Sequence, residues 1–124
     1  DGDVIIHSLI DSLLGACKLK DIGTLFSDKD SKFKNIRSIK LLKKVLNLIK
    51  LKGYEINNID INVISQKPKI NKYRNKIINS ISKLCNIYPK QINIKGKTTE
   101  KLGLIGKEKA IAAEVITSVS KYDE

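Results

Sequence analysis

The sequence predicts an α+β fold, a two-layer α/β sandwich in which helices cover one face of a sheet. Two observations favour this class: apolar residues recur at helical spacing in some segments, and they alternate with polar residues in others. The chain has 124 residues, enough for one domain with its own core. Because helices would cover only one sheet face, the other face needs a cover, and we expect self-association through the sheet.

Helices are predicted over residues 4–17, 39–49 and 70–85, where apolar side chains follow the helical repeat. Gly53 supplies a stop for the second helix, shortly after Lys50 and Lys52. Pro68 fits just before the third helix, where its missing N–H costs little. Each helix would therefore turn one apolar stripe toward a core.

Strands are predicted where apolar and polar residues alternate. Residues 58–63 give the clearest alternation and indicate a half-buried strand, and residues 92–95 and 111–119 indicate two more. The polar, glycine-containing segment 97–109 is expected to be a loop. The order helix, helix, strand, helix, strand, long loop, strand gives the sandwich and its layers.

Composition argues against nucleic-acid binding and against a membrane span. The formal net charge is +11, but all except Arg37 and Arg74 of the 24 basic residues are lysine, and aromatic residues make up only 5%. Proteins that bind nucleic acid usually use arginine forks and aromatic stacking, so we expect no nucleic-acid partner. No run of eighteen apolar residues occurs, so we expect no membrane span. A basic nucleic-acid-binding domain stays as the alternative function.

The first helix and the segment after it carry acidic and histidine side chains. Asp3, His7 and Asp11 are spaced by four and share one helical stripe, where an imidazole could bind zinc beside a carboxylate. Asp21 and Gly23 form a turn whose carboxylate could accept hydrogen bonds from a polyol. On spacing alone, a solvated polar helix face with a lone histidine is the favoured explanation of the first pattern, and an ordinary capped loop explains the second at least as well.

Two later segments could bind anions. Gln66 and Lys69 flank Pro68 at a strand-to-helix junction, where backbone amides and a lysine favour phosphate. Thr98 and Glu100 follow the next strand, where a hydroxyl could hold phosphate oxygens and a carboxylate could ligate a divalent ion. An exposed turn in a lysine-rich chain is the alternative for the first segment.

The order of these motifs resembles the 2-C-methyl-D-erythritol 2,4-cyclodiphosphate synthase family over essentially the whole chain. The resemblance implies a mixed four-stranded sheet and a homotrimer, associated through the sheet side, with active sites between subunits. It implies a phosphorus–oxygen lyase that converts 4-diphosphocytidyl-2-C-methyl-D-erythritol 2-phosphate to the cyclic diphosphate and CMP, a step of non-mevalonate isoprenoid biosynthesis. The motifs that carry it are Asp1-Gly2-Asp3-Val4 with His7, Leu14-Gly15-Ala16, Asp21-Ile22-Gly23 with Phe26, Lys52-Gly53-Tyr54, Gln66 with Pro68-Lys69, Thr98-Thr99-Glu100-Lys101-Leu102-Gly103, and Ile111-Ala112 with Glu114.

The resemblance also assigns roles to individual residues. His7 matches a zinc ligand, Glu100 a ligand of a second ion (Mg²⁺ or Mn²⁺), and Thr98 the threonine that stabilises the transition state. A polyol-binding turn, a segment that closes over the substrate, a cytidine pocket and a diphosphate-binding loop complete the site. The substrate-binding residues so implied are Asp21, Ile22, Gly23, Phe26, Ser27, Asp28, Lys29, Asp30, Ser65, Gln66, Lys67, Pro68, Lys69, Ile70, Asn71, Lys97, Thr98, Thr99, Glu100, Leu104 and Lys107.

The chain departs from the family pattern at several points. We expect a single domain over 1–124 that lacks the first strands of the family and two further zinc ligands upstream of Asp1, so that these residues alone would be inactive. Lys97 stands where threonine is usual, and Lys107 where an arginine usually lies near the trimer axis, which weakens the case for prenyl diphosphates in the axial cavity. An inactive trimeric scaffold is a further alternative. We expect a plastid (apicoplast-like) or bacterial cytoplasmic location.

Overall fold

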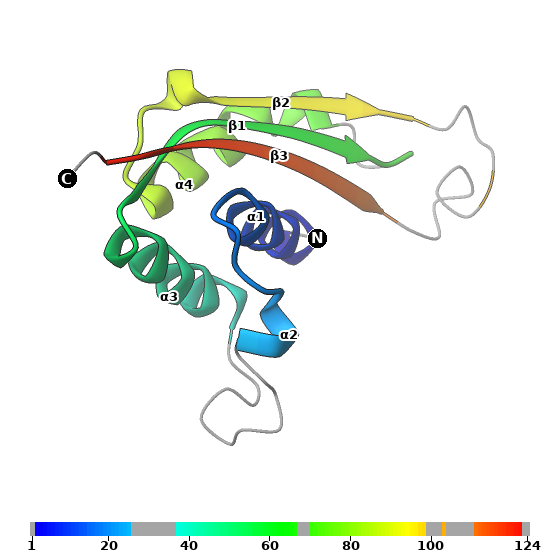
Figure 1. The fold of residues 1–124 in the computed structure, drawn as a ribbon. Coiled ribbons are helices and arrows are strands. Elements are labelled where there is room, and N and C mark those ends of the chain that lie inside the picture. The colour runs from blue at the N-terminus through cyan, green and yellow to red at the C-terminus, as the bar shows by residue number, and fades with distance from the viewer. Residues whose placement is uncertain (1, 26–36, 67–69, 99–102, 104–110, 123–124) are drawn as a thin grey trace.

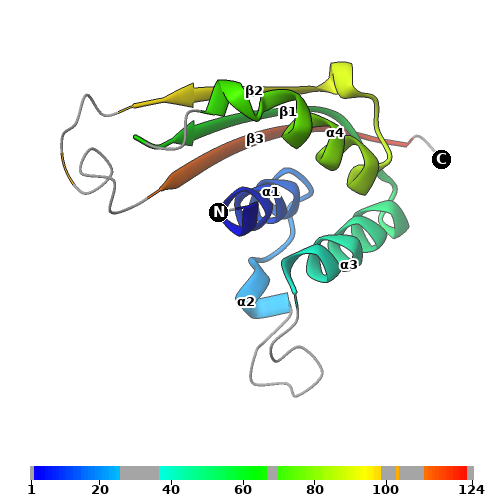
Figure 2. The ribbon, with the colours of Figure 1, turned by 180° about the vertical axis from the view of Figure 1, so that it is seen from behind.

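The computed structural model describes residues 2–25, 37–66, 70–98, 103 and 111–122. These residues form one mixed sheet with helices on one of its faces (Figures 1 and 2). This arrangement confirms the predicted α+β class. The elements are, in chain order, α1 (Gly2–Ala16), α2 (Ile22–Leu25), α3 (Ser38–Leu51), β1 (Tyr54–Ile64), η1 (Ile70–Lys72), α4 (Arg74–Cys85), η2 (Pro89–Gln91), β2 (Ile92–Lys97) and β3 (Ala112–Lys121).

The sheet has the order β2-β1-β3 within the described residues. β1 pairs with β2 in parallel and with β3 in antiparallel orientation, so the sheet is mixed as expected. The described residues supply three strands, and the expected fourth strand is not confirmed. β1 is longer than the predicted 58–63, because it also pairs with β3 through Tyr54 to Ile56, where a register shift interrupts the alternation.

The three predicted helices are present, with two differences. α1 and α3 match the predicted segments, and Gly53 has a φ of +88°, the left-handed conformation that lets the chain turn from α3 into β1. The helix predicted over 70–85 is confirmed from Arg74 onward, but a 3₁₀ turn, η1, precedes α4, and Tyr73 between them has a non-helical φ of −111°. The short helix α2 was not predicted. No helix among the described residues is long and apolar enough to cross a membrane.

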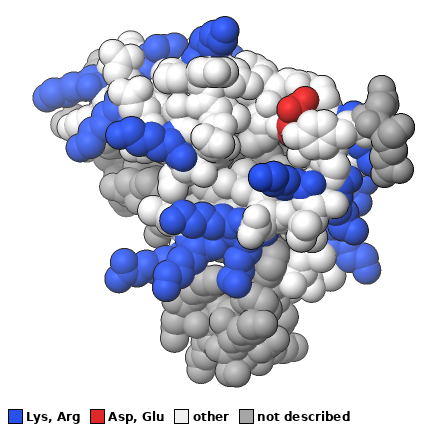
Figure 3. Space-filling model, turned by 90° about the vertical axis from the view of Figure 1, so that its left-hand side faces the viewer, with Lys and Arg blue, Asp and Glu red and all other residues white. Residues whose placement is uncertain are grey.

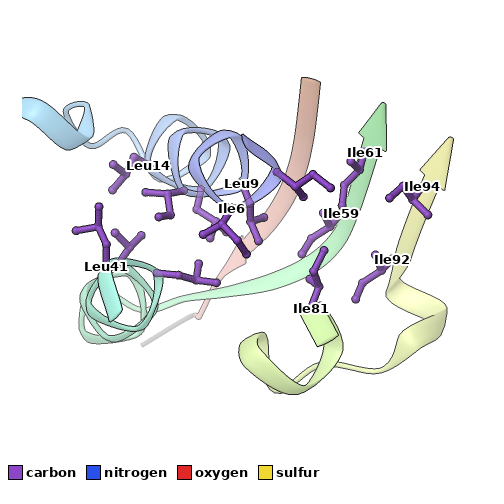
Figure 4. Packing of buried hydrophobic residues seen from close by; sticks show 14 of the residues in the cluster. Ile6, Leu9, Leu14, Leu41, Ile59, Ile61, Ile81, Ile92 and Ile94 are labelled. Carbon is purple, nitrogen blue, oxygen red and sulfur yellow. The ribbon is translucent and has the colours of Figure 1, made fainter. Parts of the chain in front are cut away.

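The core lies between the helices and the inner face of the sheet. Leu9 of α1, Leu42 of α3 and Ile59 of β1 are each 0% exposed, and Figure 4 shows labelled side chains of α1, β1 and α4 meeting there. Complete burial of one such side chain is worth about 1.5–3 kcal/mol, so this cluster fixes the helices against the strands. The helices in turn position the segments that connect them to the sheet.

The outer face of the sheet is polar. Side chains alternate along a strand, so the residues between buried Ile59, Ile61 and Val63 point away from the helices. Asp60 accepts a 3.3 Å hydrogen bond from Asn93 and pairs with Lys95 at 3.1 Å on this face. Described helices do not cover it, which leaves the face available for another subunit.

Candidate active site

The carboxyl ends of β1 and β2 bring two predicted substrate-binding segments together. The strands are parallel, and Ile64 is the register partner of Lys97, so both strands end at the same edge of the sheet. The backbone N–H of Ser65 donates a 2.9 Å hydrogen bond to the carbonyl oxygen of Lys97. Residues 65–66 and 97–98 are therefore neighbours although about thirty residues separate them in sequence.

A third predicted segment packs on the same edge. Ile70, the first residue of η1, lies so close to β2 that a Cβ built on Gly96 would be 3.0 Å from the Ile70 Cβ. Glycine at this strand position thus allows the backbone of β2 to approach η1 closely. The structure therefore brings the start of η1 against β2, close to the end of that strand.

Arg74 fixes the junction of η1 and α4 to β2. Its Nε donates a 3.2 Å hydrogen bond to the carbonyl oxygen of Ile94, and its NH2 group donates a 2.9 Å hydrogen bond to Oδ1 of Asn93. The guanidinium fork suits two acceptors on one strand, which a lysine could not match. Sequence reasoning counted Arg74 only as part of the positive charge and missed this positioning role.

His7 lies on α1, and its side chain is exposed. The hydroxyl of Ser8 donates a 3.2 Å hydrogen bond to the carbonyl oxygen of Ala113, whose register partner on β1 is Val63. The first half of α1 therefore lies beneath the carboxyl end of β1. His7 consequently belongs to the same end of the molecule as residues 65–66 and 97–98.

A complete metal site is not formed by the described residues. They contain no group of three or more histidine, cysteine, aspartate or glutamate side chains that could hold an ion. His7 is available as one ligand, and Asp11 is exposed on the same helix. The described part of the chain does not by itself fit zinc.

Asp21 is exposed and begins α2. Its Oδ1 accepts a 3.1 Å hydrogen bond from the backbone N–H of Thr24, and hydrogen bonds from the Thr24 hydroxyl and N–H lower the pKa of this carboxyl. Gly23 has no atom within 4 Å of a Cβ built on it. The predicted polyol-binding turn is therefore an open, capped helical turn whose carboxylate stays ionised.

α2 does not meet the strand ends within one chain. Figures 1 and 2 both show α2 on the opposite side of α1 from the sheet. The structure thus brings together residues 65–66, 70–71 and 97–98 near α1, and leaves Asp21 and Gly23 apart from them. A site that uses all of these residues needs α2 from another subunit.

Beside the strand ends lies an apolar hollow of about 600 Å³. Ser65, Ile70 and Ile111 line it together with apolar residues of α1, α3 and α4. Sequence reasoning missed this hollow, because the residues that line it follow the same helical repeat as core residues. Its size lies within the usual range for small-molecule pockets.

Other predicted site residues cannot be compared with the structure. The backbone of Ile22 lies in α2, but its side chain is outside the described part. The remaining predicted residues that lie outside the described residues are Phe26, Ser27, Asp28, Lys29, Asp30, Lys67, Pro68, Lys69, Thr99, Glu100, Leu104 and Lys107.

Comparison with known proteins relates the chain to one family. The model of the YgbB family matches residues 1–120. A bifunctional enzyme IspD/IspF of Pelagibacter ubique is 63% identical over 123 residues, which are 99% of this chain and 33% of that protein. A 2-C-methyl-D-erythritol 2,4-cyclodiphosphate synthase of Wigglesworthia glossinidia brevipalpis is 55% identical over 94% of this chain and 74% of that protein.

Solved structures agree with these relatives. A bifunctional IspDF from Campylobacter jejuni matches with a TM-score of 0.90 and 41% identity, over 99% of this chain and 33% of that one. An IspF from Plasmodium falciparum, solved as a CDP complex, matches with a TM-score of 0.83 and 45% identity, over 98% of this chain and 72% of that one. The chain spans about a third of the length of the bifunctional relatives.

Proposed function

The chain belongs to the YgbB family, and from this premise we propose that it converts 4-diphosphocytidyl-2-C-methyl-D-erythritol 2-phosphate to 2-C-methyl-D-erythritol 2,4-cyclodiphosphate and CMP. The observation that carries the proposal is the hydrogen bond from Ser65 to Lys97, which joins two substrate-binding segments at one sheet edge. Relatives at 50–56% identity bear the name of this synthase, which supports the same reaction.

The reaction is an intramolecular phosphoryl transfer. An oxygen of the 2-phosphate attacks the β-phosphorus, the bond from that phosphorus to the oxygen bridging the two phosphates breaks, and CMP leaves with this oxygen. Nucleophile and leaving group belong to one molecule, so the protein contributes mainly alignment and charge stabilisation. Thr98, directly after β2, is exposed at the strand ends, where its hydroxyl can donate to a phosphate oxygen.

We place the cytidine at the segment 65–71. Solved relatives named as CDP complexes support a cytidine nucleotide as ligand. Ser65 and Ile70 line the apolar hollow, which offers a flat base an apolar surface beside backbone polar groups. Lys97 at the end of β2 is exposed and gives a positive charge next to the diphosphate.

Metal ions are the part of the proposal that depends on residues beyond the described ones. We assign His7 one coordination position of zinc, and Glu100, outside the described residues, one position of Mg²⁺ or Mn²⁺. A bound divalent ion would neutralise phosphate charge. The described residues do not complete either ligand set, so no step of the reaction is assigned to a metal.

We propose that the active unit is a homotrimer that packs through the outer sheet face and has a fourth strand in each subunit. The polar outer face and the separation of α2 from the strand ends support this arrangement. Asp21 of one subunit would then bind the polyol of a substrate held by Thr98 of its neighbour. The apicoplast and bacterial relatives favour a plastid-like or bacterial cytoplasmic location.

Mixing two inactive variants tests both parts of the proposal. Asp21→Asn and Thr98→Ala should each abolish most CMP release from the substrate, and subunits refolded together should regain about a quarter of wild-type activity, because about one interface in four pairs two intact halves. Absence of CMP release from the wild-type protein would refute the synthase activity. Activity in the wild type without recovery on mixing would refute only the shared site.

A further inference from the structure

A second groove lies at the opposite end of the molecule. It has a volume of about 690 Å³ and is lined by α3, the start of β1, the end of α4 and the segment that follows it. β1 has 11 residues, so its two ends are roughly 35 Å apart, and the groove at Tyr54 is separate from the strand ends at Ser65. Of the residues that line the groove, Leu84 alone also lines the apolar hollow of the proposed synthase site, so the two are distinct.

Lysines surround the groove. Lys43 and Lys50 of α3 line one wall, and no ion pair within the described residues neutralises them. Lys90 lies 5.5 Å from the ring centre of Tyr88, and Lys121 lies 5.5 Å from that of Tyr54. Figure 3, which shows this side of the molecule, has many basic and few acidic side chains.

The floor and rim of the groove resemble a protein interface. Ile49, Ile56 and Leu84 give an apolar floor, and Glu55 is the acidic residue in the lining. Tyr88 is 70% exposed and Tyr122 is 51% exposed at the rim, although tyrosine is a residue that interfaces commonly bury. An apolar floor with exposed tyrosines and a lysine rim fits a polypeptide with carboxylates flanking apolar side chains.

We propose that this groove, which we call the lysine groove, binds an acidic segment of a partner protein. Nucleic acid fits less well. Proteins that bind the nucleic-acid backbone favour arginine, and neither Arg37 nor Arg74 is among the residues that line the groove. Arg74 is hydrogen-bonded to β2 at the far end of α4. A lysine ammonium lies over the ring of Tyr54 and another over the ring of Tyr88. Each ammonium would compete with a nucleic-acid base for stacking on that ring.

Fluorescence anisotropy with the intact protein tests the proposal. The probe is a labelled peptide of alternating glutamate and leucine, and the comparisons are the same peptide with lysine for glutamate and an oligothymidine. We expect the acidic peptide to bind most tightly, and added salt to weaken it. Equal or tighter binding of the oligothymidine, or no binding of the acidic peptide, would overturn the proposal.

Matched variants locate the binding. The double change Lys43→Glu with Lys50→Glu should weaken the acidic peptide about tenfold or more, whereas Lys20→Glu with Lys83→Glu, which alters net charge equally outside the groove, should change it less than about twofold. Asn47→Trp fills the groove without changing charge and should also weaken binding. If both double variants weaken binding equally, or Asn47→Trp has no effect, the groove is not the site.

Discussion

Replacing Gly96 by alanine tests whether the close contact between η1 and β2 shapes the proposed nucleotide site. The added Cβ would lie 3.0 Å from Cβ and 3.6 Å from Cγ2 of Ile70. Non-bonded carbons are most stable at about 3.5–4.0 Å, so one of the two residues must move by roughly half an ångström. The closest atom is Cβ, which no rotamer change displaces, so the backbone of η1 or β2 has to shift.

The size of the expected effect on CMP binding and on stability follows from this contact. Overpacking of this kind costs about 1–3 kcal/mol. If η1 moves away from β2, segment 65–71 changes shape and CMP binding weakens by about fivefold to a hundredfold. If η1 stays, the same strain lowers the free energy of unfolding, and each kcal/mol lowers Tm by about 4 °C.

Calorimetric titration with CMP and thermal unfolding, performed on the same samples, separate these outcomes. Gly15→Ala is the control, because a Cβ at Gly15 in α1 has no atom within 4 Å and alanine in a helix stabilises by about 0.5–1 kcal/mol. The reasoning is refuted if Gly96→Ala leaves both CMP affinity and Tm at their wild-type values. A loss of Tm without any loss of affinity would instead show that η1 does not move.

Three further outcomes are expected. Arg74→Ala should lower the free energy of unfolding by about 1–3 kcal/mol, because it removes both hydrogen bonds to β2, and Arg74→Lys should restore at most one of them; equal stability of all three proteins in urea would contradict this. In an NMR titration the pKa of Asp21 should lie below the ordinary aspartate range, because hydrogen bonds from Thr24 lower it. The ionised carboxylate therefore caps α2 at neutral pH, and this stabilisation is lost only in strong acid. Thr24→Ala should raise the pKa of Asp21, and an unchanged pKa would show that Thr24 does not lower it. Burial raises the pKa of the Cys85 thiol to about 11, so iodoacetamide at pH 8 should label it only in urea; rapid labelling of the folded protein would be the contrary result.

Local sequence patterns predicted the elements whose limits depend on local residues alone. The apolar repeats of α1 and α3 predicted these two helices, and Gly53 ends α3 because it adopts a left-handed φ. The helix predicted over 70–85 is confirmed from Arg74 to Cys85 and wrong before it, although Ile70 and the apolar residues of α4 follow one repeat and both pack against the core. Ile70 also lies against Gly96 of β2, in a separate 3₁₀ turn, and the helical backbone is interrupted at Tyr73. The contact with β2 is tertiary and leaves no trace in periodicity.

The site shows a similar division. Residue types and the family resemblance named the segments that we expect to bind substrate, but only the parallel register of β1 and β2 places Ser65 beside Lys97. Arg74 was missed because its partners are a backbone carbonyl and an asparagine, neither of which is acidic. All of the predicted residues between 26 and 30 and between 99 and 107 lie outside the described part of the chain, so those predictions stay predictions.

Two features of the chain support the proposed homotrimer. Ile116 on β3 is 72% exposed beside Asp60, its register partner on β1, so the outer face carries an apolar side chain that a neighbouring subunit would bury. Independently, α2, which directly follows Asp21, lies across α1 from the sheet, whereas Thr98 directly follows β2 (Figures 1 and 2). A neighbouring subunit that only covered the sheet would not bring an α2 to the strand ends. A neighbouring subunit that only supplied α2 would leave Ile116 exposed. A symmetric assembly satisfies both with one repeated contact, because each subunit then gives its α2 to one neighbour and its strand ends to the other.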